Sequence, residues 1–280
     1  TEFGHYSKIC YPCVASDENA NLNGPQKELL LWHWKLGIGM HRLQELMRPT
    51  EMIEKTGVKH TLPPVINPKF KSTPNCVVPK CMACELARAN RRSTGVSSSK
   101  QHAEKEGALD RDAYEPGDFV SADQYIVNTP GRLPTGYGRE SRENRFHGGT
   151  IFQDSATGAI WAENQVSLGT SETLMSKERF EQWLWDLAST EIKQLHGDNG
   201  IFAAEEFRKD CKHKHQKQTF SGVGAHHQNA KAERAIQSIM YMARSFMVHV
   251  ALHWTERGVD DLALWSFAVK HAVWLHNRIP

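Results

Sequence analysis

The pattern of apolar and polar positions divides the chain into a short helical region and a longer mixed α/β region. In ELLLWHWKLGIGMHRLQELM, apolar residues at helical spacing predict helix at both ends of residues 28–47, with Gly37 and Gly39 between the two helical parts. The proline-rich residues 58–75 show little periodicity, so we expect a loop there.

The region after Pro116 alternates predicted strands and helices, since period-2 apolar runs favour strands and apolar stripes at 3–4 spacing favour helices. The predicted strands are 116–127, 147–154, 158–166, 191–198 and 217–221, and the predicted helices are 171–189, 202–212, 229–250 and 260–277. Residues 155–157 join the second and third strands in a hairpin. This order predicts an α/β fold with a mixed sheet and helices on its faces.

Local composition adds the predicted domain boundaries. They are a polar tail at 1–24, a small helical domain at 25–90, a basic, serine-rich linker at 91–115 and the α/β domain at 116–280. The linker contains ARANRRSTGVSSSKQ, which is poor in apolar residues and suits a flexible segment or an arm that contacts nucleic acid.

Composition excludes some classes of protein. The 280 residues are 39% hydrophobic and 24% charged, as in ordinary globular proteins, and the formal net charge is only +2. No stretch approaches the roughly 18 apolar residues of a membrane span, and no secretory signal is recognisable. We expect no membrane association. Because the chain begins at Thr1 and stops at Pro280, we also expect a fragment of a longer polyprotein.

The cysteines favour a metal site. The chain has 6 cysteines and 15 histidines, and two cysteine pairs have CxxC spacing. Without a secretory signature, this indicates metal binding in a reducing compartment, not a disulfide framework. Cys81 and Cys84 are the strongest pair for a structural zinc ion, because a CxxC turn presents two thiolates to one ion. The role of the other pair, Cys10 and Cys13, stays open.

The sequence leaves the remaining zinc ligands open. His33 is a candidate third ligand, and the alternative is that it simply packs between Trp32 and Trp34. The fourth position is open, with His41 first and then His60 or Cys76.

Three acidic residues form the candidate catalytic group. Asp123 and Asp198 lie in predicted strands, and Glu233 lies near the start of the long helix. Three carboxylates brought together by a fold suit two Mg²⁺ (or Mn²⁺) ions, which support phosphoryl transfer. The alternative is that they are unrelated surface residues, since a chain of this length offers many acidic triplets.

Neighbours of Glu233 are candidates for nucleic-acid contact. Asn229, Glu233 and Gln237 share one face of the predicted helix, and Lys231 and Arg234 flank the acid. Three further basic clusters could neutralise phosphates or could simply be solvated. They are Arg88, Arg91 and Arg92; Arg139, Arg142 and Arg145; and Lys209, Lys212, Lys214 and Lys217.

Several segments in the same order resemble copia-type (Pseudoviridae-like) LTR retrotransposon Gag-Pol polyproteins. HHQNAKAERAIQSIM resembles the Q-N-G-x-A-E-R segment of their integrases, and DFVSADQY and LHGDN resemble the segments with the first two acids. LLLWHWKLG followed by CxxC is similar to the zinc-binding pre-integrase region, and AVWLHNRIP is similar to the closing helix of the core.

The resemblance implies an RNase H-like fold and a DDE-type polynucleotidyl transferase with Asp123, Asp198 and Glu233 as metal ligands. It implies a pre-integrase domain at 25–90 and a C-terminally truncated catalytic core at 116–280. Element ends and a target duplex would be the DNA partners of a homo-oligomer. It would act in the nucleus after a cytoplasmic virus-like particle stage.

The sequence departs from the family pattern at two places. Ala230 stands where the family has Gly, and Ile38 occupies the position of the second zinc histidine. Two other functions therefore remain open. One is a repurposed nucleic-acid-binding adaptor without catalysis, and the other is a plain RNase H-like nuclease.

Overall fold

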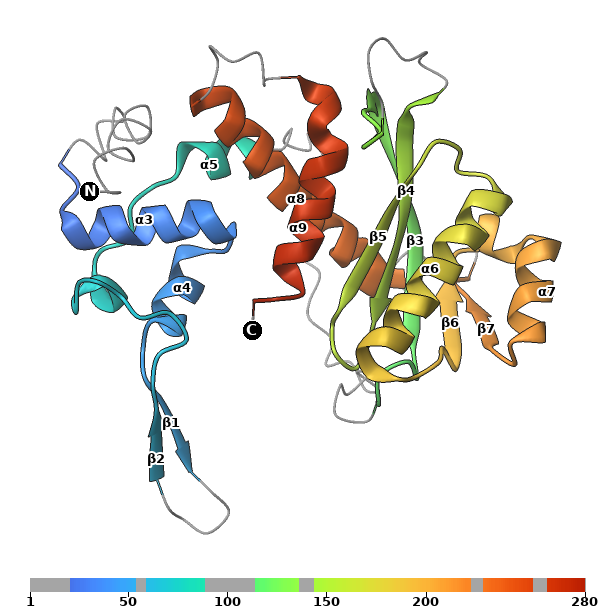
Figure 1. Cartoon of the computed structure of the whole chain (residues 1–280), viewed down its shortest axis with the longest axis horizontal. Helices are drawn as coiled ribbons and strands as arrows, with labels where there is room; N and C mark the ends of the chain where they lie inside the picture. Colours follow the sequence, from blue (N-terminus) through green and yellow to red (C-terminus); the bar gives the residue numbers. More distant parts are fainter. Residues whose placement is uncertain are drawn as a thin grey trace, which may run out of the picture. The chain divides into compact units, whose positions relative to one another are not determined.

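The computed structural model describes residues 21–53, 59–88, 114–135, 144–222, 229–253 and 261–279 (Figure 1). The chain forms two compact units. The first is Thr1–Ala89 with Arg244–Asp260, and the second is Asn90–Ala243 with Asp261–Pro280. Residues 244–260, which the sequence analysis assigned to the α/β domain, thus cluster with the N-terminal region. Cys10, Cys13 and linker residues 91–113 lie outside the described residues.

Helix α3 (Gly24–Leu36) is capped at both ends by residue types that favour helix termini. At its start Asn23 and Gln26 form a reciprocal capping box, in which each side chain accepts a hydrogen bond from the backbone N–H of the other, at 3.0 and 3.1 Å. At its end Gly37 takes a left-handed φ of 66° and donates its N–H to the carbonyl of His33. The predicted interruption at Gly37 is therefore a helix C-cap.

The first unit continues with α4 (Met40–Leu46), the antiparallel hairpin of β1 (Thr50–Ile53) and β2 (Lys59–Leu62), the 3₁₀ turn η2 (Thr73–Asn75) and α5 (Met82–Arg88). Strand β2 and η2 lie in the segment predicted as loop. Strand β2 gains its hydrogen bonds by pairing with β1, which local periodicity does not reveal. The last part of α8 (Ala230–His253) completes the unit.

A buried carboxylate organises the interior of the first unit. Glu28 accepts hydrogen bonds from the backbone N–H groups of Lys69 and Phe70, at 2.6 and 3.1 Å. It also accepts one from the hydroxyl of Thr73 at 2.6 Å. These partners offset the cost of burying a charge, and they fasten the proline-rich segment to α3.

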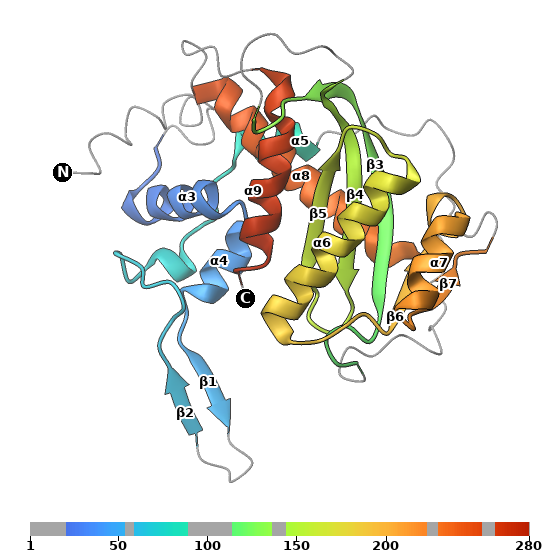
Figure 2. The same ribbon diagram turned by 45° about the vertical axis from the view of Figure 1, so that its right-hand side comes forward.

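The second unit is built on a five-stranded mixed sheet (Figures 1 and 2). Its strands are β3 (Val120–Gly131), β4 (Phe146–Asp154), β5 (Ile160–Gln165), β6 (Gln194–Gly197) and β7 (Lys217–Phe220). Their spatial order is β5-β4-β3-β6-β7. Strand β4 is antiparallel to β3 and β5, whereas β6 is parallel to β3 and β7 is parallel to β6.

Helices accompany this sheet in the order that the sequence predicts. They are α6 (Thr170–Ala188), α7 (Glu205–His213), the first part of α8 and α9 (Trp265–His276), with the 3₁₀ turns η5 (Ile201–Ala203) and η8 (Leu262–Leu264). The expected mixed five-stranded sheet with flanking helices is confirmed, and its strand order and directions are those of RNase H-like folds.

The two faces of the sheet pack against different helices. On one face Phe152 stacks on Phe180 of α6 with ring centroids 5.0 Å apart. On the other face the hydroxyl of Tyr125 donates to Asn164, whose amide donates to the carbonyl of Ser266 in α9. Because side chains alternate along a strand, Asp123 shares the face of Tyr125. The first candidate acid therefore lies on the face opposite α6.

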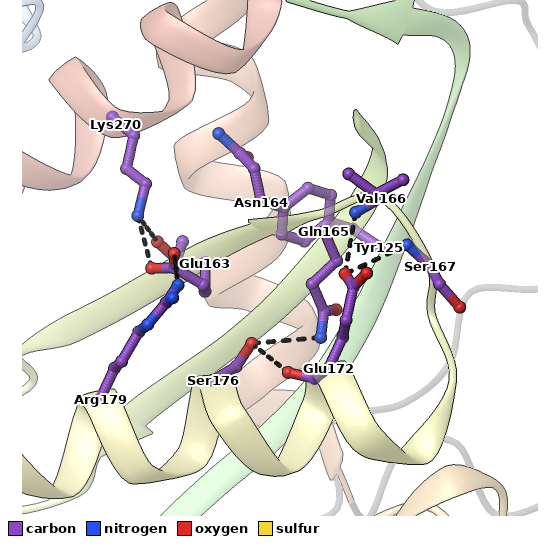
Figure 3. A network of polar contacts seen from close by, with 11 residues as sticks. Tyr125, Glu163, Asn164, Gln165, Val166, Ser167, Glu172, Ser176, Arg179 and Lys270 are labelled. Carbon is purple, nitrogen blue, oxygen red and sulfur yellow. Dashed lines mark hydrogen bonds and ion pairs between the residues drawn. The ribbon is translucent and has the colours of Figure 1, made fainter. Parts of the chain in front are cut away.

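Strand β5 and the start of α6 are tied together by polar contacts (Figure 3). Glu172, in the first turn of α6, accepts from the backbone N–H groups of Val166 and Ser167 at 2.9 and 3.1 Å. Glu163 pairs with Arg179 of α6 and with Lys270 of α9, both at 2.7 Å. One carboxylate at the edge of the sheet thus links the two helices that flank it.

Candidate functional site

Asp123 and Asp198 come from neighbouring parallel strands at the centre of the sheet. Val120 of β3 lies opposite Leu195 of β6, and Ser121 lies opposite His196. Each acid follows two residues after the second of these pairs, so both lie at the same level of strands about 4.8 Å apart. Asp123 is half-buried within β3, whereas Asp198 is exposed and follows directly after β6.

The third acid lies on a helix that is anchored beside the first. Asn229, immediately before α8, is only 4% exposed, and its amide donates to the carbonyl of Ala122 at 3.0 Å. Ala122 precedes Asp123 in β3. Glu233 lies one helical turn after Asn229 and is exposed. A single hydrogen bond thus fixes the start of α8 to the strand residue next to Asp123, on the helix face that Glu233 shares.

Local contacts also restrain the two strand acids. The Asp123 carboxylate accepts from the backbone N–H of Gln124 at 2.8 Å. The Asp198 carboxylate lies over Gly200, where an added Cβ would come within 2.9 Å of Oδ2. The side chain of Asn199 donates to the carbonyl of Ser221 and holds this turn at the end of β7.

The three carboxylates do not form a closed group in this structure. Within the described part of the chain, the His, Cys, Asp and Glu side chains whose ligand atoms all lie within 4.8 Å of one another form a different set. Three ionised carboxylates repel one another unless a cation neutralises them. The fold positions the backbone of these residues through the strand register and the anchored helix. It does not bring their carboxylates into close contact.

The predicted neighbours of Glu233 have different environments. The Lys231 ammonium lies over the rings of Tyr114 and Phe119, at 5.9 and 5.8 Å from their centroids, so it packs against the start of β3. Arg234 and Gln237 are exposed on the helix surface. Asn229, expected near substrate, is buried and holds the helix against β3 as described above. Two of the four predicted contact residues are therefore open to solvent.

The predicted basic clusters are only partly described. In the lysine cluster, Lys214 contacts Glu181 and Asp210 at 2.8 and 2.9 Å. Asp210 also contacts Lys177, whose side chain is fully buried, at 2.6 Å. Lys214 and Asp210 therefore belong to a packing network between α6 and α7. Arg91, Arg92, Arg139 and Arg142 lie outside the described residues.

Four residues of the first unit form a candidate metal site: His33, Cys81, Cys84 and His249. Their possible metal-ligand atoms all lie within 4.8 Å of one another. Nε2 of His33 lies 3.0 Å from Sγ of Cys84, and Nε2 of His249 lies 3.6 Å from Sγ of Cys81. His33 and Cys81 are each 5% exposed and His249 is 8% exposed. Two sulfur and two imidazole ligands in a buried cluster match the donor set of structural zinc sites.

The two thiols have strongly different acidities. The hydrogen bond from Cys84 holds the pKa of Cys81 well below its usual range, and His249 and His33 act in the same direction against the effect of burial. The pKa of Cys84 is raised because it donates to Cys81 and because it is buried.

The fourth member of this set is not the one expected. His41 and His60 are exposed, and Cys76 lies elsewhere, beside Gln44. His249 takes the fourth place, and the sequence analysis did not single it out. It sits on a long helix far along the chain from the CxxC pair, among apolar residues. Its sequence signal is a histidine beside the apolar stripe of a predicted helix, one turn after Ser245.

Comparison with known proteins gives structural likenesses only. No protein-family model and no curated protein matches the chain. The HTLV-2 integrase catalytic core domain in complex with magnesium is similar in its trimeric form at 16% identity and a TM-score of 0.38, covering 57% of this chain and 84% of that chain. The dimeric form gives 16% identity and a TM-score of 0.40, covering 59% of this chain and 89% of that chain.

A simian T-cell lymphotropic virus intasome in complex with PP2A regulatory subunit B56 gamma is also similar. It gives 15% identity and a TM-score of 0.46, covering 62% of this chain and 52% of that chain. At such identities and TM-scores these likenesses carry no weight for function, and the fold assignment rests on the strand order. Among the described residues, no helix is long and apolar enough to cross a membrane.

Proposed function

We propose that the chain is a retrotransposon integrase, a DDE-type polynucleotidyl transferase that joins element DNA to a target duplex. The observation that carries the proposal is the shared level of Asp123 and Asp198 on β3 and β6, with α8 anchored beside Asp123. Glu233 follows Asn229 by one helical turn, which supports its assignment to the same site. The family resemblance of the segments around these acids supports the same conclusion.

The donor set fits a hard cation, because all three side chains offer only carboxylate oxygens. Two bound Mg²⁺ (or Mn²⁺) ions supply activation of the attacking oxygen and stabilisation of the leaving oxygen in phosphoryl transfer. Asp123, Asp198 and Glu233 would hold the ions. Asn229 keeps the first turn of α8 on β3 and so helps to position Glu233. This chemistry needs no Ser, Cys or Tyr nucleophile.

DNA is the proposed partner, as element ends and as a target duplex. Arg234 and Gln237 are exposed on the helix that carries Glu233, where they could contact phosphate and sugar. Holding two DNA ends at once requires more than one active site, so we propose a homo-oligomer that acts in the nucleus after a cytoplasmic particle stage. Zinc is the proposed ion of the first unit, with His33, Cys81 and Cys84 as ligands.

The test is a strand-transfer assay with the whole chain and short duplexes whose terminal sequences are randomised, in Mg²⁺ and in Mn²⁺. Joined products are recovered and sequenced. We expect joining by the wild type and a loss of more than about 10²-fold in Glu233→Gln, since even an outer-shell partner of a metal ligand costs about 10–100-fold. Glu178→Gln is the matched control, because Glu178 is exposed on α6 outside the site.

Other outcomes separate the rival functions. Hydrolysis without joining, lost in Glu233→Gln, would indicate a nuclease. DNA binding with neither reaction in either metal would indicate an adaptor. Joining that survives Glu233→Gln unchanged would remove the proposed catalytic group.

A further inference from the structure

We propose that His249 is the fourth ligand of the zinc ion bound by His33, Cys81 and Cys84. The ion would then fasten the last turns of α8 to α3 and α5. This inference rests on the proposed zinc binding and is independent of strand transfer. The predicted ligands all lie in the N-terminal region of the chain. With His249 as the fourth ligand, the zinc site is complete only when α8, a helix far along the chain, packs against that region.

The spacing of the four ligand atoms suits one tetrahedral ion. With zinc bonds of about 2.3 Å to sulfur and 2.0–2.1 Å to nitrogen, neighbouring ligand atoms lie roughly 3.3–3.8 Å apart. The observed separations of 3.0 Å for His33 and Cys84 and 3.6 Å for Cys81 and His249 are close to this range. Small side-chain adjustments would therefore accommodate the ion.

The orientation of His33 is fixed by its backbone surroundings. Its Nδ1 lies 2.6 Å from the carbonyl of Ile38. A carbonyl only accepts, so Nδ1 carries the proton and the Nε2 lone pair faces Cys84 Sγ. Metal-bound histidines commonly use their second nitrogen in this way. Ile38 stands where the family pattern has a second histidine, and here it supplies a carbonyl that orients the first histidine.

Contacts along α8 show that His249 belongs to a packing interface within the first unit. Arg244 donates to the carbonyl of Ala87 at 3.1 Å, and Ser245 Oγ lies 3.8 Å from Cys84 Sγ. His249 then meets Cys81. Higher residue numbers on α8 meet lower residue numbers on α5, so the two helices run antiparallel. Ser245 and His249 are one turn apart on the face of α8 that covers the CxxC pair.

The imidazole of His249 is enclosed. It is 8% exposed, and its ring meets the edge of the Trp34 ring at a centroid distance of 5.4 Å. The expected ligand, His41, is exposed on α4. Three of the four residues are thus buried, and Cys84 is partly exposed.

The experiment uses the full chain purified under reducing conditions. Zinc content is measured by elemental analysis, and zinc affinity by competition with a chromophoric chelator. The wild type should bind one zinc ion per chain, and His41→Ala should do the same. His249→Ala should lower zinc affinity by more than about 100-fold, beyond the loss expected for an outer-shell partner. Far-UV circular dichroism with zinc present checks that His249→Ala remains folded.

Cobalt substitution and His249→Cys give a readout that a packing role cannot mimic. Zinc sites accept three cysteines and one histidine, so His249→Cys should recover tight binding. Its Co²⁺ complex should show thiolate charge-transfer absorbance about 1.5-fold that of the wild type, from three sulfurs in place of two.

The outcomes are separable. Absence of zinc from the wild type would remove the zinc proposal altogether, whatever the result of the strand-transfer assay. Unchanged affinity in His249→Ala, a loss in His41→Ala, or wild-type absorbance in His249→Cys would each assign the fourth position to another group.

Discussion

The His/Cys set of the first unit and the acidic residues of the second unit differ in how far the protein assembles them by itself. His33, Cys81, Cys84 and His249 already lie within 4.8 Å of one another, whereas Asp123, Asp198 and Glu233 do not form such a set. Thiols and imidazoles can share protons and hydrogen-bond to one another. Carboxylates near neutral pH only accept, and they repel.

The difference has a functional meaning. A structural site gains from being closed, because metal binding then adds directly to the stability of the fold. A catalytic site that must admit DNA and ions gains from being open, with its ligands positioned by the backbone. In the proposed catalytic site, the register of β3 and β6 and the Asn229 anchor would provide that positioning.

The largest predicted effect is on removal of zinc. Apparent binding free energies of structural zinc reach about 10–16 kcal/mol in small domains, which rivals the whole stability of a domain. A thiol-compatible chelator should therefore increase amide hydrogen exchange in α3 and α5 greatly and leave exchange in β3–β5 unchanged. Hydrogen exchange with mass spectrometry measures both units in one sample.

Two cysteine variants control this measurement. Cys84→Ser should show the fast exchange without chelator, whereas Cys76→Ser, outside the set, should respond like the wild type. An equal increase in amide hydrogen exchange in both units on chelation would show that the ion stabilises the whole chain. The contrast between the two units would then be wrong.

A smaller effect is expected from Asn229→Ala. Loss of the amide removes the hydrogen bond between α8 and the Ala122 carbonyl, so Glu233 is held less firmly. Activity should fall by about 10–100-fold, as for other outer-shell partners, with unchanged zinc content. Asn229→Asp keeps the shape but loses the donor and should resemble Asn229→Ala. Full activity in both would mean that the helix start is fixed by other contacts.

The smallest predicted effect is stabilisation of the second unit by Mg²⁺. At about 100 times its dissociation constant, a ligand that binds only the folded state adds about 2.7 kcal/mol, which corresponds to several degrees in Tm. Scanning calorimetry with zinc held saturating should show this increase for the wild type and for Asp186→Asn. Asp198→Asn should respond less, and without Mg²⁺ it should be no less stable than the wild type because repulsion is relieved. An equal increase in Tm on adding Mg²⁺ to Asp198→Asn would show that Mg²⁺ binds without Asp198.

Much of the second unit could be predicted from the sequence. Apolar runs bounded by turn residues predicted the five strands and their succession along the chain, because both signals depend on residues close together in sequence. The buried Lys177 with Asp210 was not predictable in this way, since the pairing joins two helices across the packed interface. The roles of Asn229 and Lys231 were likewise decided by neighbours on β3 and before it.

In the first unit the sequence by itself determined the CxxC pair, the helix cap at Gly37 and the histidine between two tryptophans, because each depends on residues close together in the chain. Only the tertiary structure decided the fourth member of the His/Cys set. His249 meets Cys81 because α8 packs antiparallel to α5, and such packing leaves no local periodic trace. Contacts between distant segments are set by the summed burial and hydrogen bonding of whole elements, which no short pattern contains.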